Sequence, residues 1–152
     1  MVHVVLVAPE IPANTGNIAR TCAATQTPLH LVDPLGFRLS DRYLKRAGLD
    51  YWDAVDLHRH DSWPQFLSHA SQFEGSRLWC LSVRGSQTYT EVSFQPQDWL
   101  IFGSESQGLD PDIMAQHPSL RIPISGPVRS LNLSNAVAIV LFEALRQLGV
   151  AR

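Results

Sequence analysis

The sequence has 152 residues, of which 45% are hydrophobic and 17% charged, and its net charge is −2. This length suits one domain with a substantial core, so we expect residues 1–152 to form a single domain. No apolar run is long enough to span a membrane, and the N-terminus lacks the basic stretch of a signal peptide. We therefore expect a cytoplasmic protein with no membrane partner. The charge excludes a generally basic nucleic-acid binder, so a polyanion would have to bind a local patch.

Apolar runs alternate with helix signals along the first half of the chain. Residues 2–8 are rich in β-branched side chains, which predicts a buried strand. Pro9 and Pro12 then mark a loop, and Asn14 or Thr15 can cap a helix that runs to about Thr25. The other predicted elements here are strands at 29–32 and 54–58, a helix over 40–48, and a helix that begins at Asp61 or Ser62.

The second half continues the alternation and indicates the fold class. Strands are predicted at 78–83, 99–102 and 120–124, a short helix from Asp110, and the longest helix at 132–148. Strands that alternate with helices predict an α/β fold, with a mostly parallel sheet flanked by helices. Ligands of such sheets bind beyond the carboxyl ends of the strands, which makes the following loops candidates: 9–17, 84–87, 103–108 and 125–132.

The helix after the first strand carries one cation in a stretch of apolar and small residues. Arg20 lies three residues after Asn17, so both side chains project from one side of the helix. A cation in such surroundings needs an anionic partner or a solvated cleft. Arg20 could contact a phosphate or a developing alkoxide, or it could form an ordinary ion pair with Asp33 or Glu10.

Two later loops have the composition of ligand-binding turns. Gly103 and Gly108 enclose Glu105 in a turn where the backbone could approach a ligand closely, although an ordinary strand-to-helix turn has the same signature. In residues 121–135, prolines and a glycine precede more short polar side chains than one helix cap needs. A neutral, amide-rich loop of this kind suits a nucleoside-type ligand. These polar residues are Ser130, Asn132, Ser134 and Asn135.

Two helices offer further surfaces. The helix over residues 136–146 is apolar almost all round, so it must be buried, and part of it could form a subunit interface. A basic stripe at helical spacing precedes the middle of the chain, and its alternative is a solvated helix face. The stripe consists of Arg38, Arg42, Lys45 and Arg46.

Histidines and cysteines give weaker hypotheses. His58 and His60 would share one strand face as a possible metal pair, but no third ligand is evident in the sequence. We therefore expect surface histidines and no metal site. Cys22 and Cys80 have no C-x-x-C partner and are expected to be buried and reduced.

Three segments, residues 9–20, 101–109 and 121–135, resemble in this order the SPOUT superfamily of methyltransferases. The resemblance is closest to its small tRNA (cytidine/uridine-34)-2′-O-methyltransferases of the TrmL type and covers residues 4–149. Residues 34–37 and 46–51 resemble this subgroup in particular. Three motifs carry the likeness: Asn14-x-Gly16-x-x-x-Arg20, Phe102-Gly103-x-Glu105-x-x-Gly108-Leu109, and Ile122-Pro123 through Ser130-x-Asn132-x-Ser134-Asn135-Ala136.

The resemblance implies a SPOUT fold with a C-terminal trefoil knot, an obligate homodimer, and no separate RNA-binding extension. It implies S-adenosyl-L-methionine as the methyl donor, S-adenosyl-L-homocysteine as product, and no metal. The cofactor-binding positions would be Leu81, Gly103, Ile122, Ser130 and Leu131. The catalytic positions would be Arg20, Asn14, Glu105 and Asn132. With no extra domain, RNA would lie across the dimer, where the basic stripe becomes a candidate contact for the anticodon stem-loop.

The implied activity is methylation of the ribose 2′-hydroxyl of the wobble nucleotide, position 34, of tRNA, with leucine tRNAs as the expected substrates. Two alternatives stay open at this point. One is 2′-O-methylation at another tRNA or rRNA position, and the other is a non-catalytic RNA-binding α/β module.

Overall fold

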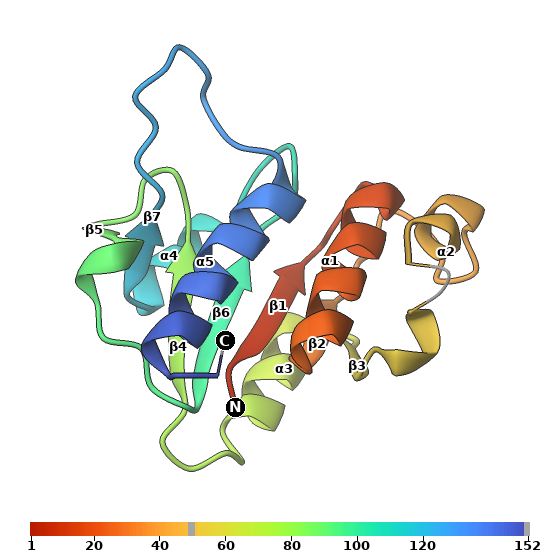
Figure 1. Cartoon of the computed structure of the whole chain (residues 1–152), viewed down its shortest axis with the longest axis horizontal. Coiled ribbons are helices and arrows are strands. Elements are labelled where there is room, and N and C mark those ends of the chain that lie inside the picture. Colours follow the sequence, from red (N-terminus) through yellow and green to blue (C-terminus); the bar gives the residue numbers. More distant parts are fainter. Residues whose placement is uncertain (49–50, 151–152) are drawn as a thin grey trace.

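A seven-stranded, entirely parallel sheet organises the protein, as described by a computed structural model for residues 1–48 and 51–150 (Figure 1). The strand order is β3-β2-β1-β6-β4-β7-β5. The strands are β1 His3–Val7, β2 Leu29–Val32, β3 Leu57–His60, β4 Arg77–Leu81, β5 Gln87–Thr88, β6 Asp98–Phe102 and β7 Ser119–Arg121. The helices are α1 Pro12–Thr25, α2 Arg42–Gly48, α3 Trp63–Ala70, α4 Pro111–Gln116 and α5 Leu133–Gln147. The predicted α/β class is confirmed, whereas the knot stays a prediction.

Helices cover both faces of the sheet. In Figure 1, α1 and α5 cross in front of the strands and α3 lies behind them. Alternation along β1 sends Val4 and Leu6 toward α1 and α5, and Val5 toward α3 and α4. Because the central strands are buried on both sides, their sequences are continuous apolar runs. None of the helices within the described ranges is long and apolar enough to cross a membrane.

Several element boundaries differ from the sequence prediction. α1 begins at Pro12, so Asn14 and Thr15 are buried inside the helix instead of capping it. α2 begins at Arg42, two residues later than predicted, because the Asp41 carboxylate accepts a hydrogen bond from the Tyr43 amide at 2.7 Å. Arg38 therefore precedes the helix, and its placement in a helical stripe was wrong.

Two strands are also displaced. β3 occupies Leu57–His60, after a short 3-10 turn at Trp52–Ala54, where a strand over 54–58 was predicted. β7 ends at Arg121, three residues before the predicted limit. The chain from residue 122 to Asn132 is consequently an irregular segment, and it leads directly into α5. Leu49 and Asp50, part of the subgroup likeness at 46–51, lie outside the described residues.

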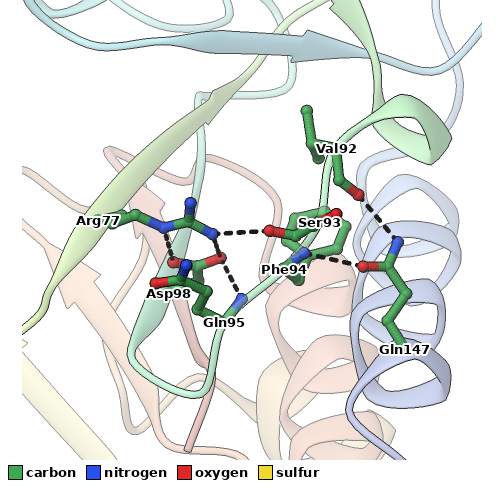
Figure 2. A network of polar contacts seen from close by, with 7 residues as sticks. All are labelled: Arg77, Val92, Ser93, Phe94, Gln95, Asp98 and Gln147. Carbon is green, nitrogen blue, oxygen red and sulfur yellow. Dashed lines mark hydrogen bonds and ion pairs between the residues drawn. The ribbon is translucent and has the colours of Figure 1, made fainter.

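A buried ion pair closes the opposite end of the sheet from the candidate loops. The Arg77 guanidinium donates two hydrogen bonds to the fully buried Asp98 carboxylate, both at 2.7 Å (Figure 2). Asp98 also accepts from the Gln95 amide, and Arg77 also donates to the Ser93 carbonyl. Gln147 then ties α5 to the same segment, through bonds with the backbone of residues 92 and 94. This network anchors the C-terminal end of α5.

Candidate active site

The loops that follow β1, β4, β6 and β7 converge on one cavity of about 1150 Å³. Its lining includes all five residues predicted to bind the cofactor, which are Leu81, Gly103, Ile122, Ser130 and Leu131. Three of the four predicted catalytic residues line it as well: Asn14, Glu105 and Asn132. The cavity lies at the carboxyl ends of the central strands, where parallel α/β sheets bind their ligands.

Glu105 holds the start of α1. Its carboxylate accepts hydrogen bonds from the backbone amides of Glu10 at 2.9 Å and Ile11 at 2.7 Å. The N-cap residue Ile11 offers no side-chain cap of its own, so a carboxylate from a distant loop satisfies these amides. A negative charge at a helix N-terminus also interacts favourably with the helix dipole. In this geometry Glu105 positions the first segment.

Glu10, in the loop after β1, binds the loop after β6 in return. Its carboxylate accepts hydrogen bonds from the Ser106 hydroxyl at 2.6 Å and from the Ser106 amide at 3.2 Å. These hydrogen bonds, the hydroxyl of Ser106 first among them, lower the pKa of Glu10. Since Glu10 and Glu105 each accept from the other's loop, the loops after β1 and β6 form one interlocked unit.

Asn14 connects this unit to α5. Its side-chain amide donates to Glu105 at 3.3 Å, and its carbonyl oxygen accepts from the Asn132 amide at 3.1 Å. Asn132 is the N-cap of α5, and its side-chain carbonyl oxygen accepts hydrogen bonds from the Ser134 amide at 2.9 Å and the Ser134 hydroxyl at 2.6 Å. All three motifs named in the sequence are therefore linked by hydrogen bonds.

Gly103 allows the loop after β6 to fold tightly against itself. A Cβ atom at this position would lie 2.0 Å from the carbonyl carbon of Gly108, so no larger residue fits without a backbone shift. Gly108 has a φ of 69°, in the left-handed region that favours glycine, and it pairs with Ser104 to close the turn. The close approach that Gly103 permits is between two parts of the loop itself, and the expected close approach to a ligand stays a prediction.

Arg20 has a different place from the other predicted catalytic residues. It lies on the exposed side of α1, and among the described residues it is not part of the cavity lining. Its guanidinium carbon lies 4.7 Å from the centroid of the Tyr51 ring. The two carboxylates considered as its ion-pair partners are bound elsewhere: Asp33 by Arg59 at 2.9 Å, and Glu10 by Ser106.

The basic stripe lies beside this helix. Arg38, Arg42, Lys45 and Arg46 are all exposed, and α2, which carries three of them, packs against α1. The Arg42 guanidinium also stacks over the Tyr43 ring at 4.9 Å. The positive charges and Arg20 thus belong to neighbouring helices, which agrees with a common polyanionic partner.

Two cations of the cavity were missed by the sequence analysis. Arg84 and Arg129 line it, from the loops after β4 and before α5. Both loops were named as candidate regions, but a single arginine in a loop has no pattern that distinguishes it from a solvated one. Tyr51 was quoted only as part of a likeness, because nothing in its local sequence indicates a contact with Arg20.

A family model described as the SpoU rRNA Methylase family matches residues 1–142. The chain belongs to this family. A relative from Burkholderia ambifaria, named tRNA (cytidine(34)-2′-O)-methyltransferase, is 46% identical over 152 residues, covering 98% of this chain and 97% of its own. The SPOUT methyltransferase resemblance is thereby confirmed.

Solved structures of the SpoU family share the fold. One, from work on the 2-OH methylation of C/U34 on tRNA, is 52% identical and has a TM-score of 0.95, with 98% of this chain and 97% of that chain covered. An AdoMet-bound rRNA methyltransferase from Sinorhizobium meliloti is 28% identical with a TM-score of 0.86, over 97% of this chain and 56% of that one. The short SpoU-family chain described here thus corresponds to only part of some relatives and to almost the whole length of others.

Proposed function

We propose that this chain transfers a methyl group from S-adenosyl-L-methionine to the ribose 2′-hydroxyl of the nucleotide at position 34 of tRNA. The observation that carries the proposal is the hydrogen-bonded chain Glu105–Asn14–Asn132, which joins all three family motifs around one cavity. The name of the 46% identical relative supports the substrate and the position. Since tRNA is the substrate, the activity belongs in the cytoplasm.

The cavity has the chemistry for a nucleoside-type cofactor. Leu81, Ile122 and Leu131 supply apolar side chains, while Ser130 and the backbone at Gly103 supply hydrogen-bonding groups. This is the mixture of apolar walls and a few polar groups found in small-molecule sites. S-adenosylmethionine, when bound, supplies a methyl group on a sulfonium, which needs no metal for activation. The AdoMet-bound relative supports this choice of cofactor.

Arg20 has the proposed catalytic role, while Asn14, Glu105 and Asn132 hold the segments in place. A guanidinium has a pKa above about 12, so Arg20 does not act as a free base at neutral pH. It binds the phosphate that flanks the target ribose, and its charge stabilises the developing alkoxide. Arg20→Lys keeps a charge but loses the planar fork. We expect it to lower turnover, and near-normal turnover with unchanged RNA affinity would contradict this role.

A homodimer completes the proposed site. α5 buries Val140 and Leu141 in the core but leaves Ile139 and Phe142 exposed, by 37% and 48%. An exposed apolar face of this kind fits a subunit interface. Arg20 is exposed and does not line the cavity of its own chain, so we infer that it serves the cavity of the partner subunit. Phe142→Glu should give monomers by light scattering, while Val128→Glu, exposed by 59% on a loop, should leave dimers.

Mixed dimers test whether Arg20 acts across the interface. Arg20→Ala protein is unfolded and refolded together with an equal amount of Leu131→Arg protein, in which the cavity is blocked. If sites use residues of both chains, half of the dimers are mixed and each contains one intact site, so about a quarter of wild-type activity returns. If Arg20 serves its own chain, no mixed dimer contains an intact site and activity stays at background.

Methyl transfer itself is tested with labelled S-adenosylmethionine and bulk tRNA, followed by mapping of the labelled nucleotide. Label on the position-34 ribose, with leucine tRNAs as the expected acceptors, supports the proposal. Label on another tRNA ribose or on rRNA would overturn the substrate assignment.

A non-catalytic RNA-binding module is tested by thermal shift: S-adenosylhomocysteine at 100 times its Kd should stabilise the protein by about 2.7 kcal/mol. No shift would favour the binding module.

The basic stripe is the proposed contact for the anticodon stem-loop. Arg42→Glu combined with Lys45→Glu should weaken tRNA binding and reduce its salt dependence, because each phosphate contact contributes to the salt slope. The matched control is Arg59→Glu, an exposed arginine on β3 that pairs with Asp33. An equal loss of tRNA affinity in both variants would argue against a specific role for the stripe.

A further inference from the structure

Five of the six histidines of the chain gather on one face of the sheet, on the side of α3. His3 belongs to β1, His30 to β2, His58 and His60 to β3, and His69 to α3. Residues two apart on a strand share a face, so the prediction that His58 and His60 share one is confirmed. The expectation of surface histidines is wrong for His60, which is only 9% exposed. The partners of His60 that the sequence did not reveal are His30 on β2 and His69 on α3.

The imidazoles are close enough to act on one ion. His30 Nδ1 lies 2.9 Å from His60 Nε2, and one nitrogen each of His30, His60 and His69 lie within 4.8 Å of one another. Zinc–imidazole bonds of roughly 2.0–2.1 Å place two nitrogens of a tetrahedral site about 3.4 Å apart. The two nitrogens of the His30–His60 pair are already near this separation. The half-buried His69 side chain has to move by about 1 Å to become the third ligand.

We propose that His30, His60 and His69 form a binding site for a divalent transition-metal ion of the zinc class. Imidazole-only sites suit zinc, copper and nickel rather than magnesium or calcium, which need oxygen ligands. Three protein ligands leave a fourth position for water. None of the three residues lines the cavity described above, and α3 covers the opposite face of the sheet from α1 and α5. The site is therefore separate from the proposed methyl-transfer site (Figure 1).

The surroundings of His30 support metal binding. His3 Nδ1 lies 3.0 Å from His30 Nε2, so the second ring nitrogen of His30 is held by a hydrogen bond, as is usual for metal-binding histidines. His3 in turn stacks on Trp99 at 3.8 Å, which fixes its ring. Burial, with the neighbouring histidines adding to it, lowers the pKa of His30 to about 2. A neutral imidazole carries one ring proton, so with that proton on Nε2 toward His3, the Nδ1 lone pair of His30 faces His60 and can bind a metal.

A bound ion would join three elements at the edge of the sheet. The ligands come from β2, β3 and α3, and β3 is the outermost strand on that side. Since β3 has only β2 as a strand neighbour within the described ranges, a metal bridge would restrain it directly. We therefore expect metal binding to raise the melting temperature of the protein, independently of methyl transfer.

The experiment uses the full chain without an affinity tag, freed of metal with EDTA, and Zn²⁺ as the probe in isothermal titration calorimetry. We expect one Zn²⁺ per chain and a rise in melting temperature that grows with Zn²⁺ concentration. Co²⁺ at the same site should give the visible absorption of a tetrahedral complex. Binding without defined stoichiometry, or no binding, would overturn the proposal.

Variants identify the ligands. His69→Gln and His60→Gln should each weaken Zn²⁺ binding by at least about tenfold. Changing a residue that only hydrogen-bonds to a metal ligand already costs about that much affinity, so loss of a ligand itself should cost no less. Two matched controls should bind as wild type: His58→Gln, whose Nε2 is held by Asp56 at 2.8 Å, and His117→Gln, outside the cluster. Circular dichroism confirms that each variant is folded before titration. Wild-type affinity in His69→Gln, or the same loss in His117→Gln, would contradict the assigned ligands.

Discussion

The guanidinium carbon of Arg20 lies 4.7 Å from the centroid of the Tyr51 ring, on the exposed side of α1. A long, solvated arginine has many rotamers, and an aromatic ring under its planar group favours one of them. The contact joins the proposed catalytic residue to the segment that follows α2. We therefore expect the Tyr51 ring to position the Arg20 guanidinium.

Tyr51→Ala should lower kcat/KM for tRNA about two- to fivefold, corresponding to the roughly 0.5–1 kcal/mol of an exposed cation–π contact. Tyr51→Phe keeps the ring and should retain near wild-type activity. S-adenosylhomocysteine affinity should be unchanged in both variants, because the cavity is untouched. Steady-state kinetics with tRNA measures the first effect and calorimetry the second. Equal losses in the alanine and phenylalanine variants would show that the hydroxyl, and not the ring face, matters.

Glu105→Gln should both destabilise the protein and weaken cofactor binding. The substitution removes the charge from two hydrogen bonds to backbone amides at the start of α1. Hydrogen bonds to charged groups contribute about 1.5–3 kcal/mol, and the amide oxygen retains part of this, so we expect a loss of roughly 1–2 kcal/mol. Urea unfolding measures the stability, with the exposed Glu91→Gln as the control. A variant as stable as wild type would mean that water replaces the carboxylate without loss.

Asp98→Asn should lower the free energy of unfolding by about 3 kcal/mol, the lower end for breaking a buried ion pair. The lower end applies because the Arg77 side chain is 34% exposed and can regain water, whereas Asp98 is fully buried. Chemical denaturation provides the measurement, and the exposed Asp53→Asn provides the comparison. A change below about 1 kcal/mol, the usual size for a surface pair, would contradict the importance of this network.

The two thiols should resist alkylation in the native protein. Burial raises the pKa of Cys22 from 9.0 to about 12 and that of Cys80 from 9.0 to about 11. Because the thiolate is the reactive form, a raised pKa lowers the reactive fraction at pH 8 by roughly two to three orders of magnitude. Mass spectrometry after iodoacetamide treatment should find both thiols unmodified in buffer and both modified in urea. Rapid labelling of either one in buffer would show that its helix or strand opens easily.

Local signals in the sequence predicted those elements whose ends are set by neighbouring residues. Asn132 caps α5 and Ser62 caps α3 through bonds to amides two or three residues away, and the predicted starts of these helices, at residue 132 and at Asp61 or Ser62, agree with the structure to within a residue or two. The start of α1 could not be predicted this way. The backbone amides of Glu10 and Ile11, just before the helix, donate to Glu105, which lies 95 and 94 residues further along the chain. No window of local sequence contains that information.

The candidate site divides in the same manner. The glycines at 103 and 108 and the polar residues near the start of α5 mark their loops by composition, and Gly103, Gly108, Ser130 and Asn132 line the cavity. Arg38 was included in a basic stripe because its spacing to Arg42 matched a helical period, yet the helix begins only at Arg42, where the Asp41 carboxylate accepts from the Tyr43 amide. Only the His58–His60 pair of the histidine cluster was predicted, because the other members come from two further strands and a helix that the folded structure brings beside β3.

The hydrogen bond between Asn14 and Asn132 spans 118 residues of chain. During synthesis the first motif emerges from the ribosome long before the last, and a nascent chain that ends before Ser130 has neither the Asn132 side chain nor the wall of the cavity formed by residues 130–136. Domains of this kind gain their long-range contacts last. The protein therefore has a built-in order of assembly, because the cavity is complete only once residues 130–136 at the start of the final helix have docked against Asn14 and Glu105. A chain cut short anywhere before α5 ends as an inactive product.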